Sequence, residues 1–483
     1  MSEAPPTARL PREALPSERI APSDWDAAHA GLVDILAQLI RIPSVNPAAP
    51  PGGELRAAEL IAGALTDAGL EPEILEPFPG RGSVGARLRG DGTGGDPLLL
   101  LSHLDVVPAS TDGWTHDPFG GDLADGYVWG RGAVDMKGTI AMQLAVVRQL
   151  ADEARVAGRD PVSDPVPGLT RDVLFAATAD EEAGGWQGIG WLVEERPDWL
   201  RSAAALSECG GVSVTVAGRR IYPIQVAEKG FAIYRITVHG SWGHGSMPRP
   251  DNAAVLGAEA VRRLATPGAP HVVPVMERFL GAVADALPAE PGRLVRTIAH
   301  PDGRLSEAAI ASLCDPTYAL ATRALLRDTM SPNIVHAGVK YNVIPGTAEI
   351  HIDCRVLPGR IEEEIQADLI DRLGDLASVC DVELVLFGAP VESPADDDLY
   401  RLLASTVRDH DPEGTPVPGL VPFSTDAKHL ARLGIPTYGF SPLRVAEDEV
   451  FLDRFHGVDE RVSLDAVRWG LPVLYDVVRQ FCG

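Results

Sequence analysis

The chain has 483 residues, 45% of them hydrophobic and 23% charged, and its formal net charge is −26. Because one hydrophobic core rarely extends beyond about 250 to 300 residues, we expect two folded domains. The 68 acidic residues outnumber the 42 Lys and Arg, which argues against nucleic acid as a partner, since binding a phosphate backbone needs a concentrated basic surface.

The N-terminus and the cysteines bear on the cellular compartment. Residues 1–25 are polar and rich in proline, which indicates a mobile arm and no signal peptide. No run approaches the roughly 18 apolar residues of a membrane span, so we expect no membrane partner. The five cysteines lack a CxxC pair, and an odd number cannot close a complete disulfide framework. These features predict a cytoplasmic protein with reduced thiols.

The first half of the chain alternates helical and strand patterns. We expect helices at 24–42, 53–69, 136–156 and 188–199, and strands at 72–78, 83–90, 96–107, 171–182 and 204–211. The run DPLLLLSHLDVV is continuously apolar, as expected of a strand buried on both faces, and RDVLFAATADEE repeats the signal. Such alternation predicts an α/β domain with a largely parallel sheet.

The pattern changes near Lys229. We expect strands at 231–240, 331–346, 347–356 and 381–388, with helices at 251–264 and 361–376. This β-α-β-β-α-β order predicts a small ferredoxin-like α+β sheet with both helices on one face. An extra segment, 266–330, has helical patterns of its own, and the α/β pattern resumes near residue 391. We therefore predict an α/β domain of residues 1–228 and 391–483, interrupted by an α+β domain at 229–390 that includes this segment.

Polar residues end the apolar runs, at the edge of a parallel sheet where sites form. Taken alone, each is explained by a helix cap, a solvated side chain or a core histidine. Their recurrence at three successive strand ends favours a site for zinc or a similar divalent ion, because unpaired buried charge is costly. The residues are His103, Asp105, Asp135, the trio Asp180, Glu181 and Glu182, Glu208, and the late His456.

The spacing of His103 and Asp105 adds a mechanism. Alternate residues of a strand point the same way, so Asp105 is placed to accept the second ring proton of His103 and fix its tautomer. In the acidic trio, adjacent residues of an extended backbone point to opposite sides, which predicts different functions for Glu181 and Glu182. Asp180 is expected to cap the turn or support the site.

Eight motifs, in order, carry a resemblance to a known family. They are LLLLSHLDVVP, VWGRGAVDMKG, TADEEAGG, SECGG, GSWGHGSMP, KYNVIPGTAEIHIDCRV, STDAKHL and FHGVDERVS. They are similar to the motifs of the dinuclear-zinc family of aminoacylases, acetylornithine deacetylase, succinyl-diaminopimelate desuccinylase and glutamate-type carboxypeptidases. The match runs from about residue 32 to 475, apart from the extra segment. HAGVKYNVIP and YGFSPL make the chain most similar to the subgroup that includes carboxypeptidase S.

The resemblance implies an α/β/α zinc-exopeptidase catalytic domain with two Zn²⁺ ions per subunit, for which Co²⁺ or Mn²⁺ can substitute. It implies that His103, Asp135 and Glu208 bind one ion, and that Asp135, Glu182 and His456 bind the other. Glu181 would then be the general base, and the peptide bond after Asp135 would be cis. Glu208 is typical of family members that act beside a free carboxylate.

The inserted domain resembles the family's lid and dimerisation domain, which implies a homodimer. His244 in GHGSMP matches the lid histidine that reaches the oxyanion, often from the partner subunit. Asn342 and Arg355 match residues that hold the oxyanion or the substrate carboxylate, and Thr425 falls near the substrate. Without the resemblance, His244 is explained as part of a polar turn, Asn342 as a turn residue and Arg355 as a member of an ion pair. Phe423 and its neighbour replace glycines of the family's loop, which changes the pocket.

These features predict hydrolysis of an amide beside a carboxylate, in an N-acyl amino acid or at the C-terminus of a small peptide, with Glu181, Asp105 and His244 as catalytic groups. One alternative is an aminopeptidase or dipeptidase on the same site, which Glu208 disfavours. Another is a non-catalytic metal-dependent binding protein, which would be expected to lack a metal ligand or the general base.

The extra segment, residues 266–330, has two interpretations. It either enlarges the lid or supplies, through PVMERFLGAVADAL, an apolar wall for long acyl or aromatic groups.

Overall fold

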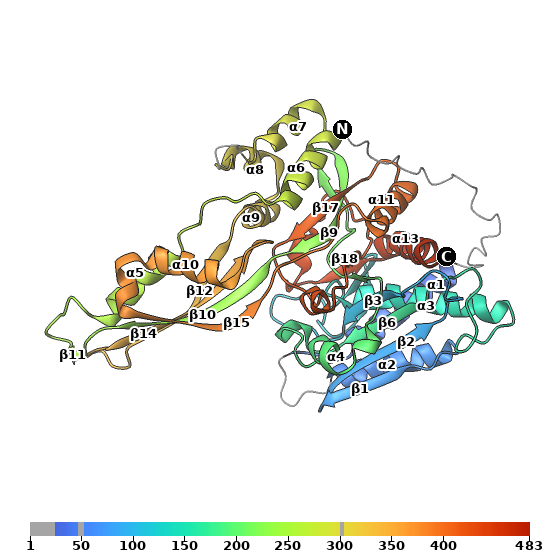
Figure 1. Cartoon of the computed structure of the whole chain (residues 1–483), viewed down its shortest axis with the longest axis horizontal. Coiled ribbons are helices and arrows are strands. Elements are labelled where there is room, and N and C mark those ends of the chain that lie inside the picture. Colours follow the sequence, from blue (N-terminus) through green and yellow to red (C-terminus); the bar gives the residue numbers. More distant parts are fainter. Residues whose placement is uncertain (1–24, 47–52, 300–303) are drawn as a thin grey trace, which may run out of the picture.

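The structure is a computed structural model that describes residues 25–46, 53–299 and 304–483. The predicted N-terminal arm lies outside the described residues, apart from Trp25. A larger domain is built on a ten-stranded sheet, and an elongated smaller domain on a four-stranded sheet projects from it (Figure 1). This arrangement confirms the predicted fold class, an α/β domain with an inserted α+β domain.

The large sheet is parallel at its centre and antiparallel at its edges. Its strands are β1 (Glu73–Phe78), β2 (Arg81–Leu88), β3 (Leu98–His103), β6 (Val173–Thr178), β7 (Ala204–Ser207), β8 (Val214–Val216), β9 (Arg219–Glu228), β16 (Val391–Glu392), β17 (Thr415–Val421) and β18 (Thr437–Gly439). The order is β1-β2-β6-β3-β7-β18-β9-β16, with β8 and β17 also paired to β9. β6, β3, β7 and β18 run parallel. β1–β2 and β8–β9 are tight hairpins, and a short hairpin connection enforces antiparallel pairing.

Helices cover both faces of this sheet. They are α1 (Trp25–Ile40), α2 (Gly53–Asp67), α3 (Lys137–Val156), α4 (Ile189–Glu195), α11 (Asp398–His410), α12 (Ala427–Leu430) and α13 (Leu464–Cys482). Every residue of β3 is buried, as the apolar run predicts. Leu98 and Leu100 pack in the core under α1, α2, α3, α11 and α13, whereas Leu99 and Leu101 pack in the core under α4 and α12. The alternation follows from the two-residue period of a strand.

Short elements complete the larger domain. A small three-stranded sheet joins β4 (Asp122–Ala124), β5 (Tyr127–Trp129) and β19 (Arg461–Ser463). Single 3₁₀ turns are η2 (Pro197–Trp199), η4 (Ala431–Leu433) and η5 (Phe451–Arg454). Among the described helices, none combines the length and the apolar character that crossing a bilayer requires.

The smaller domain has the predicted β-α-β-β-α-β order. Its strands are β10 (Gly230–His239), β12 (Thr329–Ala337), β14 (Thr347–Val356) and β15 (Cys380–Gly388), its helices are α5 (Ala253–Leu264) and α10 (Glu362–Leu373), and η3 (Gly374–Val379) is a 3₁₀ turn. The sheet is antiparallel in the order β12-β14-β10-β15. Both helices pack on one face of it. At the end remote from the larger domain, β11 (Gly243–His244) pairs with β13 (Val343–Ile344) (Figure 1).

The extra segment packs on the larger domain, although it lies between lid strands in the sequence. It forms α6 (Pro274–Ala286), α7 (Ala289–Arg296), α8 (Glu307–Leu313) and α9 (Pro316–Leu325). Val275, Met276 and Leu280 of α6 belong to the core of the large sheet, and α6 lies against β17 and β9 (Figure 1). The buried Nζ of Lys229 donates to the carbonyls of Ala324 and Arg327, which fixes the end of α9 at the junction. The interpretation of 266–330 as an enlargement of the lid is therefore wrong.

Candidate active site

Neighbouring strands bring the predicted metal ligands together. β3 pairs in parallel with β6 and with β7, so their carboxyl ends lie at one edge of the sheet. His103 ends β3, Glu182 lies in the 3₁₀ turn η1 (Glu181–Ala183) after β6, and Glu208 directly follows β7. Asp135 lies just before α3, and His456 just after η5. The Asp135–Met136 peptide bond is cis, which confirms that expectation.

Two groups of three side chains form around Asp135. In the first, His103 Nε2 lies 3.1 Å from Asp135 Oδ1 and 3.6 Å from Glu208 Oε2. In the second, His456 Nε2 lies 3.2 Å from Asp135 Oδ2 and 3.3 Å from Glu182 Oε2. Within each group the ligand atoms lie within 4.8 Å of one another, a spacing that can hold a metal ion. These are the two ligand sets that the resemblance implies, and their metal-binding role stays a prediction.

The carboxylates of both groups attract positive charge. Burial raises the pKa of Glu182 to about 7 and also raises the pKa of Glu208. Burial acts in the same direction on Asp135, but hydrogen bonds from His103 and His456 outweigh it and hold the pKa of Asp135 below its ordinary value. Hydrogen bonds to Asp135 and Glu182 raise the pKa of His456 to about 10. The site therefore favours a cation, whether an imidazolium or a metal ion.

The donor set fits zinc or a similar divalent ion. Imidazole nitrogens and carboxylate oxygens are both zinc ligands. Glu182 Oε1 is buried and has no hydrogen-bond partner among the described residues. A buried acceptor of this kind calls for an explanation, and a cation beside the second group supplies one. The residues present therefore fit the metal pair that the resemblance implies.

Three non-glycine residues with positive φ border the site. Asp180 has a φ of 76°, Cys209 of 70° and His456 of 57°. Such a conformation costs on the order of 1–3 kcal/mol and persists where the surrounding structure imposes it, often at functional sites. These residues lie next to Glu181, next to Glu208 and at His456 itself, so three of the six non-glycine residues with positive φ in the described part of the chain lie at this edge of the sheet.

Asp105 supports the site mainly through the backbone. Its fully buried carboxylate accepts hydrogen bonds from the N–H groups of Glu181 at 3.1 Å and Glu182 at 3.0 Å and from the Asn46 amide at 2.8 Å. His103 Nδ1 lies closer to the main-chain oxygen of Asp105, at 3.0 Å, than to its carboxylate, at 3.4 Å. β3 ends at His103, so strand alternation does not extend to Asp105, and the predicted carboxylate contact is the weaker of the two.

Replacing Asp105 with Ala is expected to weaken metal binding by about 10- to 100-fold, the usual cost of losing a residue that orients metal ligands. The substitution leaves the buried N–H groups of Glu181 and Glu182 without their acceptor. Competition with a chromogenic chelator measures the affinity, and Asp112→Ala, at an exposed position, is the matched control. Equal metal affinity in the Asp105→Ala variant and the unmodified protein would contradict this role.

The acidic trio is not extended, contrary to the prediction. Asp180 has a left-handed backbone, and the 3₁₀ turn η1 follows it. The turn, rather than strand alternation, therefore separates Glu181 from Glu182. Asp180 Oδ2 accepts a hydrogen bond of 2.8 Å from the N–H of Gln187, so Asp180 supports the turn as expected.

Glu181 belongs to neither ligand group. Burial raises its pKa well above the ordinary value, against the opposing effect of Lys428. Lys428 Nζ lies 4.0 Å from Glu181 Oε1 and donates to the carbonyl of Thr425 at 2.9 Å. A largely buried carboxylate that holds no place in either ligand group is suited to accept a proton.

Arg131 and Glu460 support the site but were not among its predicted residues, although both lie inside the family motifs. Glu460 is completely buried, and its carboxylate lies 2.6 Å from the Arg131 guanidinium. The same carboxylate accepts hydrogen bonds from the N–H groups of Val134 at 2.8 Å and Asp135 at 3.1 Å, which positions the residue shared by both groups. The pair is 329 residues apart in the sequence, so no local pattern predicts that the two side chains meet. The only sequence signal was that Arg131 lies in VWGRGAVDMKG and Glu460 in FHGVDERVS.

Replacing Glu460 with Ala is expected to lower the free energy of unfolding by about 3–5 kcal/mol, the cost of leaving a buried charge unpaired. Arg131 would keep its charge in an environment where its side chain is 4% exposed. Urea unfolding in the presence of a chelator measures the change independently of metal binding. Glu195→Ala, at an exposed position, controls for the loss of a carboxylate, and equal unfolding midpoints for the two variants would refute the role of the pair.

The structure places the predicted oxyanion and substrate residues in three regions. His244 and Asn342 meet at the remote end of the smaller domain, where the main-chain oxygen of Asn342 accepts a hydrogen bond of 2.9 Å from the N–H of Gly245 (Figure 1). Arg355 forms a bidentate ion pair with Asp353, at 2.8 and 3.1 Å. The buried hydroxyl of Thr425 donates to Glu228 at 2.7 Å. Their roles at the substrate stay predictions.

Comparison with known proteins identifies the family. The sequence profile described as Peptidase family M20/M25/M40 matches residues 99–480, most of the chain. The chain belongs to this family. The M20 chain is therefore an enzyme, a metallopeptidase or amidohydrolase that hydrolyses amide bonds with the help of a metal.

Two relatives and one structure illustrate the range of the M20 chain's similarities. It is 29% identical over 404 residues to probable carboxypeptidase S-like 2 of Dictyostelium discoideum, covering 79% of this chain and 71% of that protein. It is 29% identical over 382 residues to the N-fatty-acyl-amino acid synthase/hydrolase PM20D1 of Xenopus tropicalis, covering 77% and 70%. The crystal structure of the M20 metallo-carboxypeptidase Sso-CP2 from Sulfolobus solfataricus matches its fold with a TM-score of 0.68 at 15% identity, covering 93% of this chain and 99% of that one.

Proposed function

We infer that the chain hydrolyses the amide of an N-acyl amino acid, or the C-terminal peptide bond of a small peptide, with the help of two Zn²⁺ ions. The observation that carries this proposal is the pair of ligand groups that share Asp135, with the largely buried Glu181 directly before the ligand Glu182 but in neither group. The names of relatives support the substrate class, since they include a carboxypeptidase S-like protein and an N-fatty-acyl-amino acid hydrolase.

Each residue of the site has a separate role in the proposed reaction. His103, Asp135 and Glu208 would hold one ion, and Asp135, Glu182 and His456 the other. Bound metal ions act as Lewis acids that polarise an amide carbonyl and lower the pKa of water from about 15.7 towards 7. Glu181 takes a proton from the attacking water and later passes it to the leaving amine. Asp105 holds the backbone of Glu181 and Glu182, so it sets the position of base and ligand together.

The proposed active form is a cytoplasmic homodimer that pairs through the smaller domain. His244 lies in β11 and Asn342 directly precedes β13, and β11 stands at the end of the smaller domain remote from the larger domain (Figure 1). His244 is exposed and contacts Ser246. In this proposal the two side chains reach the oxyanion in the partner subunit's site.

A hydrolysis screen tests the proposed function. The panel contains N-acyl amino acids, N-blocked peptides and dipeptides with a free amine, each assayed after chelation and after addition of zinc, cobalt or manganese. Hydrolysis of the first two classes, lost on chelation and restored by a metal, is the expected result. Cleavage of free-amine dipeptides alone would assign the chain to the dipeptidase alternative, and no cleavage with metal bound would overturn the proposal.

A further inference from the structure

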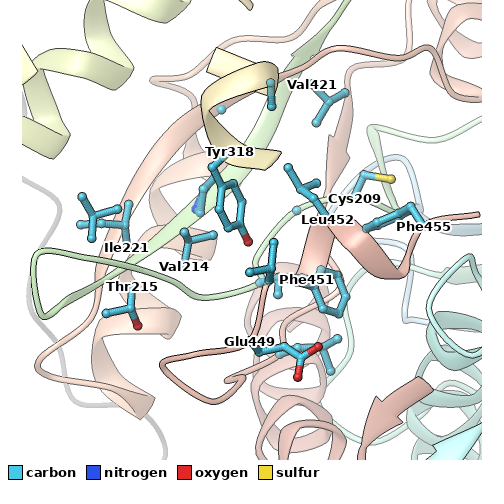
Figure 2. A pocket seen from close by; sticks show the side chains of 18 of the residues that line it. Cys209, Val214, Thr215, Ile221, Tyr318, Val421, Glu449, Phe451, Leu452 and Phe455 are labelled. Atoms are coloured by element: carbon cyan, nitrogen blue, oxygen red, sulfur yellow. The ribbon is translucent and has the colours of Figure 1, made fainter. Parts of the chain in front are cut away.

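An apolar cavity of about 390 Å³ lies between the extra segment and the large sheet (Figure 2). Met276, Phe279, Leu280 and Val283 of α6 form one wall. β8, β9 and β17 contribute to the opposite wall, and Tyr318 of α9 projects into the space (Figure 2). The cavity exists because α6 to α9 pack on the larger domain instead of on the lid.

The cavity reaches the edge of the candidate active site. Its lining includes Val134, Cys209 and Phe455, which are the chain neighbours of Asp135, Glu208 and His456. Cys209 and Phe455 lie on one side of the view in Figure 2, and Thr215 and Ile221 on the other. The space therefore extends away from the ligand groups, and a group attached to a bound amide could enter it.

Aromatic side chains stand where the cavity meets the site. The Phe455 ring lies 6.1 Å from the Phe423 ring and 5.5 Å from the Phe451 ring, measured between centroids. Phe423 is the residue that replaces a glycine of the family's loop, and it lines the cavity. These rings favour an apolar group at the entrance.

The lining determines which end of a substrate fits. No Lys, Arg or His occurs among the described lining residues, and the charged ones are acidic: Asp315, Glu447, Asp448 and Glu449. A carboxylate would be repelled there and would lose its hydration without a partner. The substrate carboxylate is thus excluded from the cavity, and of the apolar groups that remain the acyl chain is the longest.

The volume suits a long acyl chain. A buried apolar cavity of about 150 Å³ holds one benzene molecule, so by proportion 390 Å³ holds roughly 12–16 carbon atoms. An acetyl group would leave most of this space unfilled, whereas a dodecanoyl chain would occupy it.

On this basis we propose that the cavity binds the acyl chain of long-chain N-acyl amino acids and that α6 sets the chain length accepted, a proposal that rests on the proposed hydrolase function. The acyl carbonyl lies at the ligand groups, and the hydrocarbon runs past Phe423 and Phe455 towards α6. Each methylene that enters contributes through its removal from water.

Hydrolysis of N-acylglycines from acetyl to hexadecanoyl tests the proposal. We expect kcat/KM to rise by about two- to fourfold for each methylene buried, and to level off near 12–16 carbons. Val283, 5% exposed, faces the cavity. Val283→Phe is expected to lower kcat/KM for dodecanoylglycine at least tenfold and leave acetylglycine within twofold. Val156→Phe, at a position 80% exposed, is the matched control.

A binding measurement separates this proposal from the proposed function. Calorimetry on the metal-containing protein should detect saturable binding of the uncharged probe 1-dodecanol, weakened at least tenfold by Val283→Phe, and no binding of ethanol. Loss of all hydrolysis with this binding intact would overturn only the hydrolase assignment. Should Val283→Phe misfold, Val283→Ala is expected to shift the preferred acyl length upward.

Two results would overturn the acyl-chain assignment. One is a kcat/KM, and a binding affinity, that the unmodified protein shows equally for short and long chains. The other is a Val283→Phe variant that loses activity on N-acetyl-leucine and N-acetyl-phenylalanine while it keeps activity on dodecanoylglycine, because the cavity would then hold the amino-acid side chain.

Discussion

Glu181→Gln is expected to keep the metal content of the protein while its kcat falls by about 10²- to 10⁴-fold, the usual contribution of a general base. The amide has nearly the size of the carboxylate but cannot accept a proton at neutral pH. Glu181 lies in neither ligand group, so the substitution removes no predicted ligand. Steady-state kinetics on an N-acyl amino acid and elemental analysis of the same preparation measure the two quantities.

Two further variants serve as comparisons for Glu181→Gln. Glu182→Gln changes a member of the second ligand group, so it should lose metal as well as turnover. Glu195→Gln makes the same chemical change at an exposed position and should retain both. Full turnover by a metal-loaded Glu181→Gln variant would remove Glu181 from the mechanism.

His244→Ala is expected to lower kcat by about 10²- to 10³-fold, as the loss of one oxyanion donor does in other hydrolases. The residue lies at the remote end of the smaller domain, so within one chain it is not near the ligand groups (Figure 1). A large effect on kcat would therefore require a second subunit. The size of the purified protein in solution, measured by light scattering, should be that of a dimer.

Mixing two inactive variants tests whether His244 acts across subunits. Co-expressed Glu181→Gln and His244→Ala chains should recover about a quarter of the unmodified activity, because half of randomly paired dimers are mixed and each mixed dimer has one intact site. Pairing Glu181→Gln with the double variant leaves no intact site and serves as the control. Recovery no greater than in that control would place His244 within its own subunit's site or outside the mechanism.

Local patterns in the sequence predicted much of the fold and of the site. Continuous apolar runs identified β3 and β6, because a strand covered on both faces has no polar side. The polar residues that follow such runs lie at the same edge in any parallel sheet, so the grouping of His103, Glu182 and Glu208 was predictable. The division into two ligand sets came from the resemblance, since strand ends do not specify side-chain contacts.

Tertiary contacts decided the rest. Helical periodicity in 266–330 showed that one face is buried but not against which sheet, and α6 packs on β17 rather than in the lid. The ion pair between Arg131 and Glu460 spans 329 residues, and no local pattern encodes such a contact. Asp105 contacts His103 as predicted, but its hydrogen bonds to the backbone of Glu181 and Glu182 depend on the fold beyond the end of β3. Local stretches of sequence specify which side chains are apolar, which are charged and where the backbone turns. Only the folded chain decided which distant groups meet, because that depends on how all the buried surfaces pack at once.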